Sequence, residues 1–211
     1  MDLSNPATAV VPTADADVLK VLAGSSLPLT GRAIQRHTGR SQRGVQLILD
    51  RMTANGLVDR VEAGPAKLYV LNREHVAAEA VLILADLRGR LFHRIRQHLA
   101  LWEVPPLAAA VFGSAARGDG DTDSDIDILV IRPSGVSEED PAWSKDVDDL
   151  SREVHRWSGN RASVLQVSPA QVEDLLRRDA PIVADLRSDA IPMSDIGVLE
   201  TAKYPRAKDR R

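Results

Sequence analysis

The stretch VFGSAARGDGDTDSDIDILVI, residues 111–131, combines a short apolar strand, a glycine turn and a second apolar strand that begins with acids. Gly113 directly follows the first apolar run, where a residue without a β-carbon lets the backbone turn and approach a ligand closely. Backbone N–H groups at such a turn, together with the hydroxyl of Ser114, are typical of a binding site for phosphate oxygens. Arg117, one helical turn later, can add a charge-assisted contact to the same phosphates.

Two carboxylates stand at the start of the second strand. Asp125 and Asp127 are two residues apart, so strand alternation places both on one face and Ile126 on the other. Two acids on one face favour a bound cation, and divalent ions held by carboxylates can activate an attacking oxygen and stabilise a leaving pyrophosphate. The sequence therefore predicts a site for a nucleoside triphosphate with Mg²⁺ or Mn²⁺, and ATP is the favoured triphosphate.

Two other interpretations apply to the five alternating acids from Asp119 to Asp127. A calcium-binding EF-hand loop requires Gly at its sixth position and Glu at its twelfth. Counting from Asp119 gives Ser124 and Val130 at these positions, so the EF-hand pattern fails. A solvated acidic loop explains the first three acids, but it does not explain two acids within an apolar strand.

This pattern resembles the signature of the polymerase-beta nucleotidyltransferase superfamily, especially its minimal members. The positions that match are Gly113, Ser114, Arg117, Gly118, Ser124, Asp125 and Asp127. The resemblance implies transfer of a nucleoside monophosphate from a triphosphate to a protein, RNA or small-molecule acceptor. The implied catalytic and metal-binding residues are Asp125 and Asp127. The implied nucleotide-binding residues are Gly113, Ser114, Arg117 and Ser124.

The chain departs from the superfamily pattern at one position. Members with demonstrated transfer typically carry a third carboxylate on the next strand. In the expected strand 162–167, ASVLQV, we expect Gln166 at that position, and an amide cannot serve as a base. This departure motivates an alternative function: a nucleotide-sensing transcriptional regulator, or a toxin–antitoxin component, with a catalytically degenerate transferase domain.

Residues 14–73 predict three short helices followed by a β-hairpin, with Thr30 and Ser41 as caps of the second and third helices. This order resembles the winged helix-turn-helix. The resemblance implies DNA contacts from the start of the third helix and from the wing. The candidate residues are Arg40, Ser41, Gln42, Arg43, Gln46 and Lys67. The alternative is that these are ordinary solvent residues of a dimerisation or docking domain.

The remaining segments complete the expected division of the chain. We expect a flexible arm over residues 1–13, one long connecting helix over 74–103, a nucleotidyltransferase domain over 104–198 and a disordered tail over 199–211. The transferase domain is expected to have an α/β (α+β) fold in which helices cover a mixed sheet.

Composition sets limits on location and partners. A chain of 211 residues with 44% hydrophobic and 27% charged residues is globular. Cysteine is absent, which fits a reducing cytoplasm, and no run of about 18 apolar residues occurs. We therefore expect a cytoplasmic protein without a membrane partner. The net charge of −3 leaves operator DNA, a protein or RNA acceptor and a homodimer open as partners.

Overall fold

The computed structural model describes residues 1–194, which divide into two compact units. The first unit comprises Asp2 and residues 4–87, and the second comprises Met1, Leu3 and the residues from Arg88 onwards. The expected tail over 199–211, and the end of the domain expected over 104–198, lie outside the described residues.

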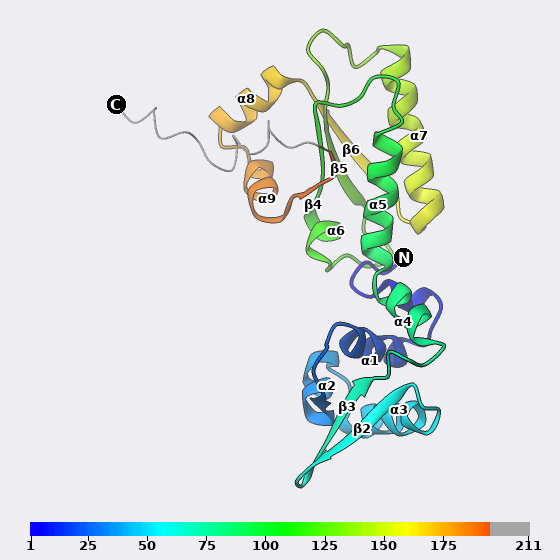
Figure 1. Ribbon diagram of the computed structural model, residues 1–211. Coiled ribbons are helices and arrows are strands. Elements are labelled where there is room, and N and C mark those ends of the chain that lie inside the picture. The colour runs from blue at the N-terminus through cyan, green and yellow to red at the C-terminus, as the bar shows by residue number, and fades with distance from the viewer. Residues whose placement is uncertain (195–211) are drawn as a thin grey trace. The chain divides into compact units, whose positions relative to one another are not determined.

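The first unit places three α-helices, α1 to α3, before a β-hairpin (Figure 1). Its elements are η1 (Pro6–Ala9), α1 (Thr13–Ala23), β1 (Leu29–Thr30), α2 (Gly31–Thr38), α3 (Gln42–Ala54), β2 (Val58–Ala63), β3 (Ala66–Leu71) and α4 (Ala78–Ala85). The strands form an antiparallel sheet in the order β1-β3-β2. The short strand β1 was not expected from the sequence.

Side-chain caps set the starts of α2 and α3. The Thr30 hydroxyl accepts a hydrogen bond from the Ala33 N–H (3.1 Å), and the Ser41 hydroxyl accepts one from the Gly44 N–H (3.2 Å). Each bond satisfies a main-chain donor that has no partner inside the first helical turn. The apolar stripe of α3 is then buried in the core of the first unit.

The flexible arm expected over residues 1–13 is instead ordered. It contains the 3-10 helix η1, and the side chain of Leu3 is only 1% exposed. Burying one leucine side chain contributes about 1.5–3 kcal/mol. Residues 1–12 are mostly small, are interrupted by prolines and show no periodic apolar pattern, so this burial could not be predicted from the sequence.

The single helix expected over residues 74–103 is instead two helices, α4 and α5 (Leu87–Leu99). They are separated at Asp86, whose ψ of 15° departs from helical geometry. Val81 of α4 belongs to the core of the first unit, whereas Leu91 and Ile95 of α5 belong to the core of the second. The apolar residues of α4 and α5 continue the same helical spacing although they pack into different cores. The sequence pattern therefore did not reveal that the helix is interrupted at Asp86.

The second unit is built on a four-stranded mixed sheet. Besides α5, its elements are β4 (Ala108–Phe112), α6 (Gly113–Arg117), β5 (Ile126–Ile131), α7 (Pro141–Ser158), β6 (Ala162–Val167), α8 (Pro169–Arg177), α9 (Pro181–Asp189) and β7 (Ile191–Pro192). The strand order is β6-β5-β4-β7, with β5 and β6 parallel and the other pairs antiparallel. This confirms the expected α/β fold with a mixed sheet.

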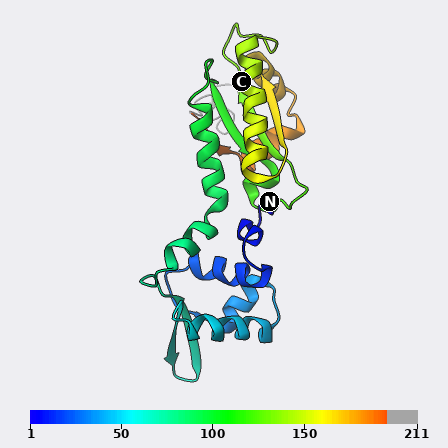
Figure 2. The same ribbon diagram turned by 90° about the vertical axis from the view of Figure 1, so that its right-hand side faces the viewer.

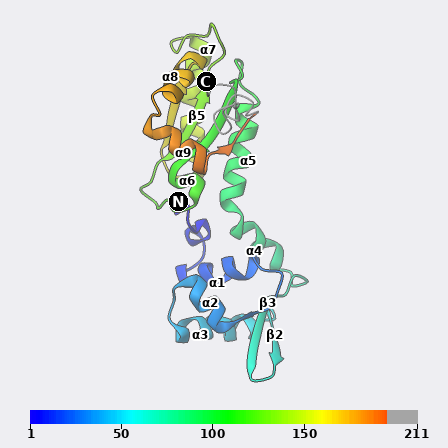
Figure 3. The same ribbon diagram turned by 90° about the vertical axis from the view of Figure 1, so that its left-hand side faces the viewer.

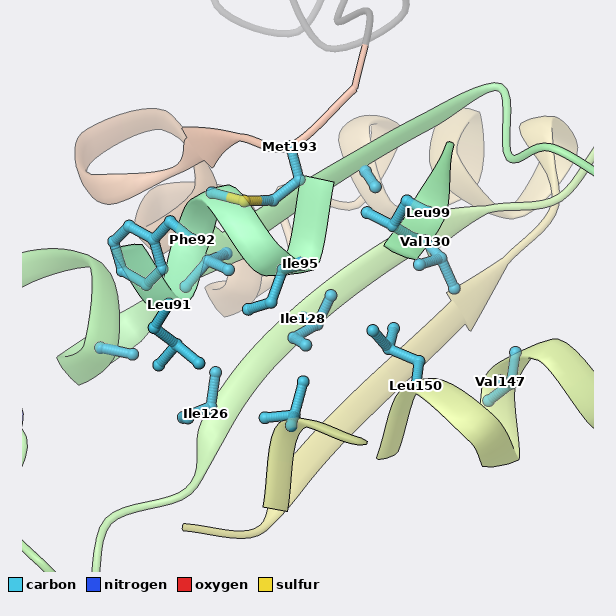
Figure 4. Close-up of a cluster of buried hydrophobic side chains, with 14 of the residues drawn as sticks. Leu91, Phe92, Ile95, Leu99, Ile126, Ile128, Val130, Val147, Leu150 and Met193 are labelled. Carbon is cyan, nitrogen blue, oxygen red and sulfur yellow. The ribbon is translucent and has the colours of Figure 1, made fainter. Parts of the chain in front are cut away.

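Helices cover both faces of this sheet. Figure 2 shows α5 and α7 on one face, and Figure 3 shows α8 and α9 on the other. Ile126 and Ile128 of β5 pack into the core beneath α5 and α7 (Figure 4), whereas Leu129 and Ile131 pack on the side of α8. Because side chains alternate along a strand, Asp127 shares the face of Leu129.

Candidate functional site

Gly113 begins α6 directly after β4, and its surroundings require glycine. Its φ is +66°, in the left-handed region that residues with a β-carbon rarely adopt. A β-carbon at this position would also lie 2.7 Å from Oδ2 of Asp127. The turn after β4 and the carboxylate on β5 are therefore direct neighbours.

Asp125 and Asp127 flank Ile126 at the start of β5. Ile126 is fully buried, so both carboxylates project from the opposite face of the strand. Burial raises the pKa of the Asp127 carboxyl above its ordinary value of 3.8, and a hydrogen bond from Ser163 opposes this rise. The negative charges of Asp125 and Asp185 raise this pKa further. A cation bound here would relieve the repulsion.

The strand beside β5 places a serine next to Asp127. In the parallel pairing of β5 with β6, Asp127 is aligned with Ser163, and Val130 is aligned with Gln166. Gln166 therefore lies on the opposite face of the sheet, where its Oε1 accepts a hydrogen bond from Nε1 of Trp143 (2.6 Å). The expectation that Gln166 occupies the third-carboxylate position is wrong. The sequence of a strand does not reveal its register with the neighbouring strand, and this register decides which side chain lies beside Asp127.

Arg117, the last residue of α6, is held by two acidic side chains. Its Nη1 lies 2.6 Å from Oδ2 of Asp189, and its Nε lies 3.1 Å from Oδ2 of Asp119. Hydrogen bonds to Asp189 and Asp119 raise the pKa of the guanidinium. Asp189 belongs to α9, which packs against α6. A phosphate bound at the turn would compete with these carboxylates for Arg117.

The side chains of Ser114 and Ser124 both lie close to Gly120. A β-carbon on Gly120 would lie 3.0 Å from Oγ of Ser114 and 3.3 Å from Cβ of Ser124. The Ser124 hydroxyl donates to Oδ1 of Asp121 (2.7 Å) and accepts from the Asp121 N–H (3.0 Å). In this conformation Ser124 shapes the loop that leads to Asp125.

Three residues of the site were not expected from the sequence: Ser163 and Asp185, which act on Asp127, and Asp189, which pairs with Arg117. The alignment of Ser163 with Asp127 depends on strand register. Asp185 and Asp189 lie on α9, far along the chain from the acidic motif, and the sequence around them shows no signal beyond helical spacing.

The acidic pair fits a divalent cation in donor chemistry. Within residues 1–194, no group of three or more His, Cys, Asp or Glu side chains is arranged to hold a metal ion. Asp125 and Asp127 supply carboxylate oxygens, the ligands that Mg²⁺ and Mn²⁺ prefer. Mg²⁺ commonly takes one or two carboxylates and completes its shell with substrate phosphates and water.

Three of the candidate DNA-contacting residues of the first unit, Arg40, Ser41 and Gln46, are engaged in local contacts. Ser41 caps α3, as described above. Arg40 forms an ion pair with Asp17 of α1, with 2.7 Å between Nη2 and Oδ2. The contacts of Arg40 and Ser41 direct both side chains toward the first unit itself.

Four candidates lie around the start of α3 and the hairpin, and one of them, Gln46, donates from Nε2 to Oδ1 of Asp50 (2.8 Å) and to the Tyr69 hydroxyl (3.0 Å). Gln42, Gln46 and Lys67 line a groove of about 450 Å³ together with Arg32. Arg43 is exposed beside Gln42 and Gln46 on the neighbouring surface. The structure thus brings Lys67 of the hairpin together with α3.

The second unit places a glycine turn and two carboxylates side by side on neighbouring strands. Its glycine turn follows one strand, and its two carboxylates begin the adjacent strand. Residues 94–191 match the family model of the nucleotidyltransferase domain. The match supports a nucleotidyltransferase domain in this part of the chain, and domains of this family in general transfer a nucleoside monophosphate and typically use a triphosphate with a divalent metal.

Searches of curated proteins and of solved structures returned no match to the chain. None of the helices within residues 1–194 combines the length and the apolar character needed to span a membrane.

Proposed function

We propose that the second unit transfers a nucleoside monophosphate from a nucleoside triphosphate, ATP in the first instance, to a protein, RNA or small-molecule acceptor. The observation that carries this proposal is the proximity of Gly113 and Asp127. A β-carbon on Gly113 would lie 2.7 Å from the Asp127 carboxylate. The phosphate-binding turn and the carboxylate pair are thus close enough to act on one bound triphosphate.

The residues of this site would have distinct roles. The main chain at Gly113 and the Ser114 hydroxyl would bind triphosphate oxygens, and Arg117 would exchange its carboxylate partners for phosphate. Asp125 and Asp127 would hold Mg²⁺ or Mn²⁺, which when bound supplies positive charge to the acceptor oxygen and to the leaving pyrophosphate. The absence of a carboxylate at position 163 leaves open the degenerate, nucleotide-sensing alternative.

A labelling experiment tests this proposal. The chain is incubated with each α-labelled triphosphate, with Mg²⁺ or Mn²⁺, in the presence of total protein or total RNA. We expect label to pass from one triphosphate to one of these fractions, and we expect the double variant Asp125→Asn/Asp127→Asn to lose this transfer. The control, Asp123→Asn/Asp148→Asn, removes the same charge from exposed positions. Equal labelling by wild type and Asp125→Asn/Asp127→Asn would contradict the proposal.

We propose as a second function that residues 14–73 form a winged helix that binds DNA, including operator DNA. The supporting observation is the convergence of Gln42, Gln46 and Lys67 with Arg32 around one open groove. Long polar side chains at the start of a helix and on a wing are suited to phosphates and base edges. If the transferase site only senses nucleotide, the same interface would serve a regulator or an autoregulating toxin–antitoxin component.

The test is binding to labelled duplex DNA at several salt concentrations. We expect Arg43→Ala/Lys67→Ala to weaken binding and to reduce the slope of log K against log salt by about 2, because each removed phosphate contact contributes about 1. The control Arg51→Ala/Arg73→Ala removes two basic residues that do not line the groove. Undetectable DNA binding by wild type at low salt would exclude this second function.

A further inference from the structure

The loop from Gly118 to Ser124 joins the phosphate-binding turn to the carboxylate pair. Three of its residues, Asp119, Asp121 and Asp123, are exposed and carry like charges that repel one another. Within the loop, the Asp121 carboxylate accepts hydrogen bonds from the Ser124 hydroxyl (2.7 Å) and the Asp123 N–H (3.0 Å). This turn orders one end of the loop but does not attach it to the sheet.

Asn160, two residues before β6, attaches that end of the loop. Its side chain is 2% exposed, and its Nδ2 donates to the carbonyl oxygens of Ser124 (2.9 Å), Asp121 (3.2 Å) and Thr122 (3.4 Å). Its Oδ1 accepts a hydrogen bond from the main-chain nitrogen of Met1 (2.7 Å). A buried amide with only main-chain partners fixes the backbone to which those partners belong.

Two further residues contact the loop closer to α6. The Leu3 N–H donates to the carbonyl oxygen of Gly120 (2.8 Å), and the Leu3 side chain is buried in the core with Phe92. The guanidinium of Arg88 occupies the position that a β-carbon of Gly118 would need. Gly118 has a φ of +77°, in the left-handed region that favours glycine.

We propose that Asn160 is a positioning residue for the transfer site. It attaches the loop at Ser124, and Leu3 attaches the same loop at Gly120. Asn160 bonds the carbonyl of Ser124, and Asp125 is the next residue in the chain. A loop that is held at Gly120 and Ser124 therefore fixes where Asp125 stands relative to the Gly113 turn. This role rests on the proposed nucleotidyl transfer, because it concerns the spacing of that site.

The first test replaces Asn160 with a residue of the same shape. In Asn160→Asp, a carboxylate replaces the amide donor and faces three carbonyl oxygens. Hydrogen exchange of the nucleotide-free chain, followed on peptides covering residues 113–127, should become about tenfold faster, because a buried donor is lost. Titration with ATP and Mg²⁺ should show binding weaker by about tenfold.

A matched control and a rescue separate positioning from general stability. Asn72 of the first unit also donates its Nδ2 to a carbonyl oxygen, that of Gly56 (2.9 Å), so Asn72→Asp should leave loop exchange and ATP affinity at wild-type values. Leu3→Ala should change both quantities in the same direction as Asn160→Asp. Leu3→Met, which conserves side-chain volume, should restore both.

The outcomes distinguish this role from the proposed function. If wild type binds ATP with Mg²⁺ and Asn160→Asp binds equally well, the positioning role is overturned and the transfer proposal stands. Wild-type loop exchange in both Asn160→Asp and Leu3→Ala would also overturn it. If wild type binds none of the four triphosphates with Mg²⁺, both proposals fail together.

Discussion

Asp127 is aligned with Ser163 across the parallel strands β5 and β6, so the Ser163 side chain adjoins the Asp127 carboxylate and opposes the rise of its pKa. The side chain that adjoins the acidic pair on the next strand is therefore a neutral hydroxyl. A metal ion at Asp125 and Asp127 would have to take its remaining ligands from substrate and water. This relationship also shows where a third acid could be introduced.

Ser163→Asp should strengthen metal binding. An added carboxylate beside Asp127 supplies a third anionic ligand, and we expect Mg²⁺ affinity to rise on the order of tenfold in a calorimetric titration. Gln166→Asp is the control, because it adds the same charge on the opposite face. It should leave Mg²⁺ affinity unchanged and should destabilise the fold by about 1–3 kcal/mol, because the buried Trp143 N–H faces a changed partner. Equal Mg²⁺ affinities in the two variants would contradict the strand register described here.

Gly113→Ala should destabilise the chain more than a glycine substitution at an open turn. At Gly135 the φ is +88° and a β-carbon would meet nothing within 4 Å, so Gly135→Ala incurs only the backbone penalty of about 1–2 kcal/mol. Gly113→Ala adds a clash with the Asp127 carboxylate, and we expect a total loss of about 2–5 kcal/mol. Urea unfolding of both variants measures the difference, and equal losses would count against the close approach of Asp127.

Asp127→Asn should remove a pH-dependent destabilisation of the metal-free chain. The pKa of Asp127 is raised in the folded state, chiefly by burial, so the folded chain holds this proton more tightly than the unfolded chain. Stability therefore falls as pH rises from the ordinary value of 3.8 through the raised pKa, and the loss persists above it. In urea unfolding with a chelator present, Asp127→Asn should be more stable than wild type above this window and equal to it below pH 3.8.

In the same urea unfolding measurement, Asp121→Asn should change stability in the opposite direction to Asp127→Asn. A hydrogen bond from the Ser124 hydroxyl, followed by one from the Asp123 N–H, lowers the pKa of Asp121. Its stabilising contribution is therefore present above pH 3.8 and is lost as the pH falls through the lowered pKa. Asp121→Asn should be less stable than wild type at neutral pH, and the difference should shrink in acid. Parallel pH profiles for the two variants would argue against these assignments.

Asp189→Asn should tighten triphosphate binding. Asp189 holds the guanidinium that is proposed to bind phosphate, and neutralising it removes a competitor for Arg117. Exposed ion pairs contribute about 0.2–1 kcal/mol, so the expected gain in affinity is about two- to fivefold. Asp174→Asn, which breaks the exposed ion pairs of Asp174 with Arg177 and Arg178, should leave affinity unchanged. A loss of affinity in Asp189→Asn would instead show that Asp189 orients Arg117 for binding.

Features encoded within short segments could be predicted from the sequence. The strand alternation that places Asp125 and Asp127 together, and the caps supplied by Thr30 and Ser41, depend on neighbouring residues and on local backbone geometry. The succession of strands and helices in the second unit followed from apolar runs separated by helical spacing, whereas the mixed sheet was implied by the resemblance to nucleotidyltransferases. Prediction failed at Asp86, which separates α4 from α5, because the apolar periodicity of two successive helices does not report that their side chains enter different cores.

The sequence by itself determined the glycine turn and the acidic pair, because these lie within residues 111–131 and their geometry is set by the local backbone. Only the tertiary structure decided their surroundings. Strand register places Ser163 beside Asp127, and the packing of α9 against α6 brings Asp189 to Arg117. The anchoring of the acidic loop by Asn160 likewise joins segments that are distant in the chain. Such contacts depend on how whole elements pack, which no short stretch of sequence encodes.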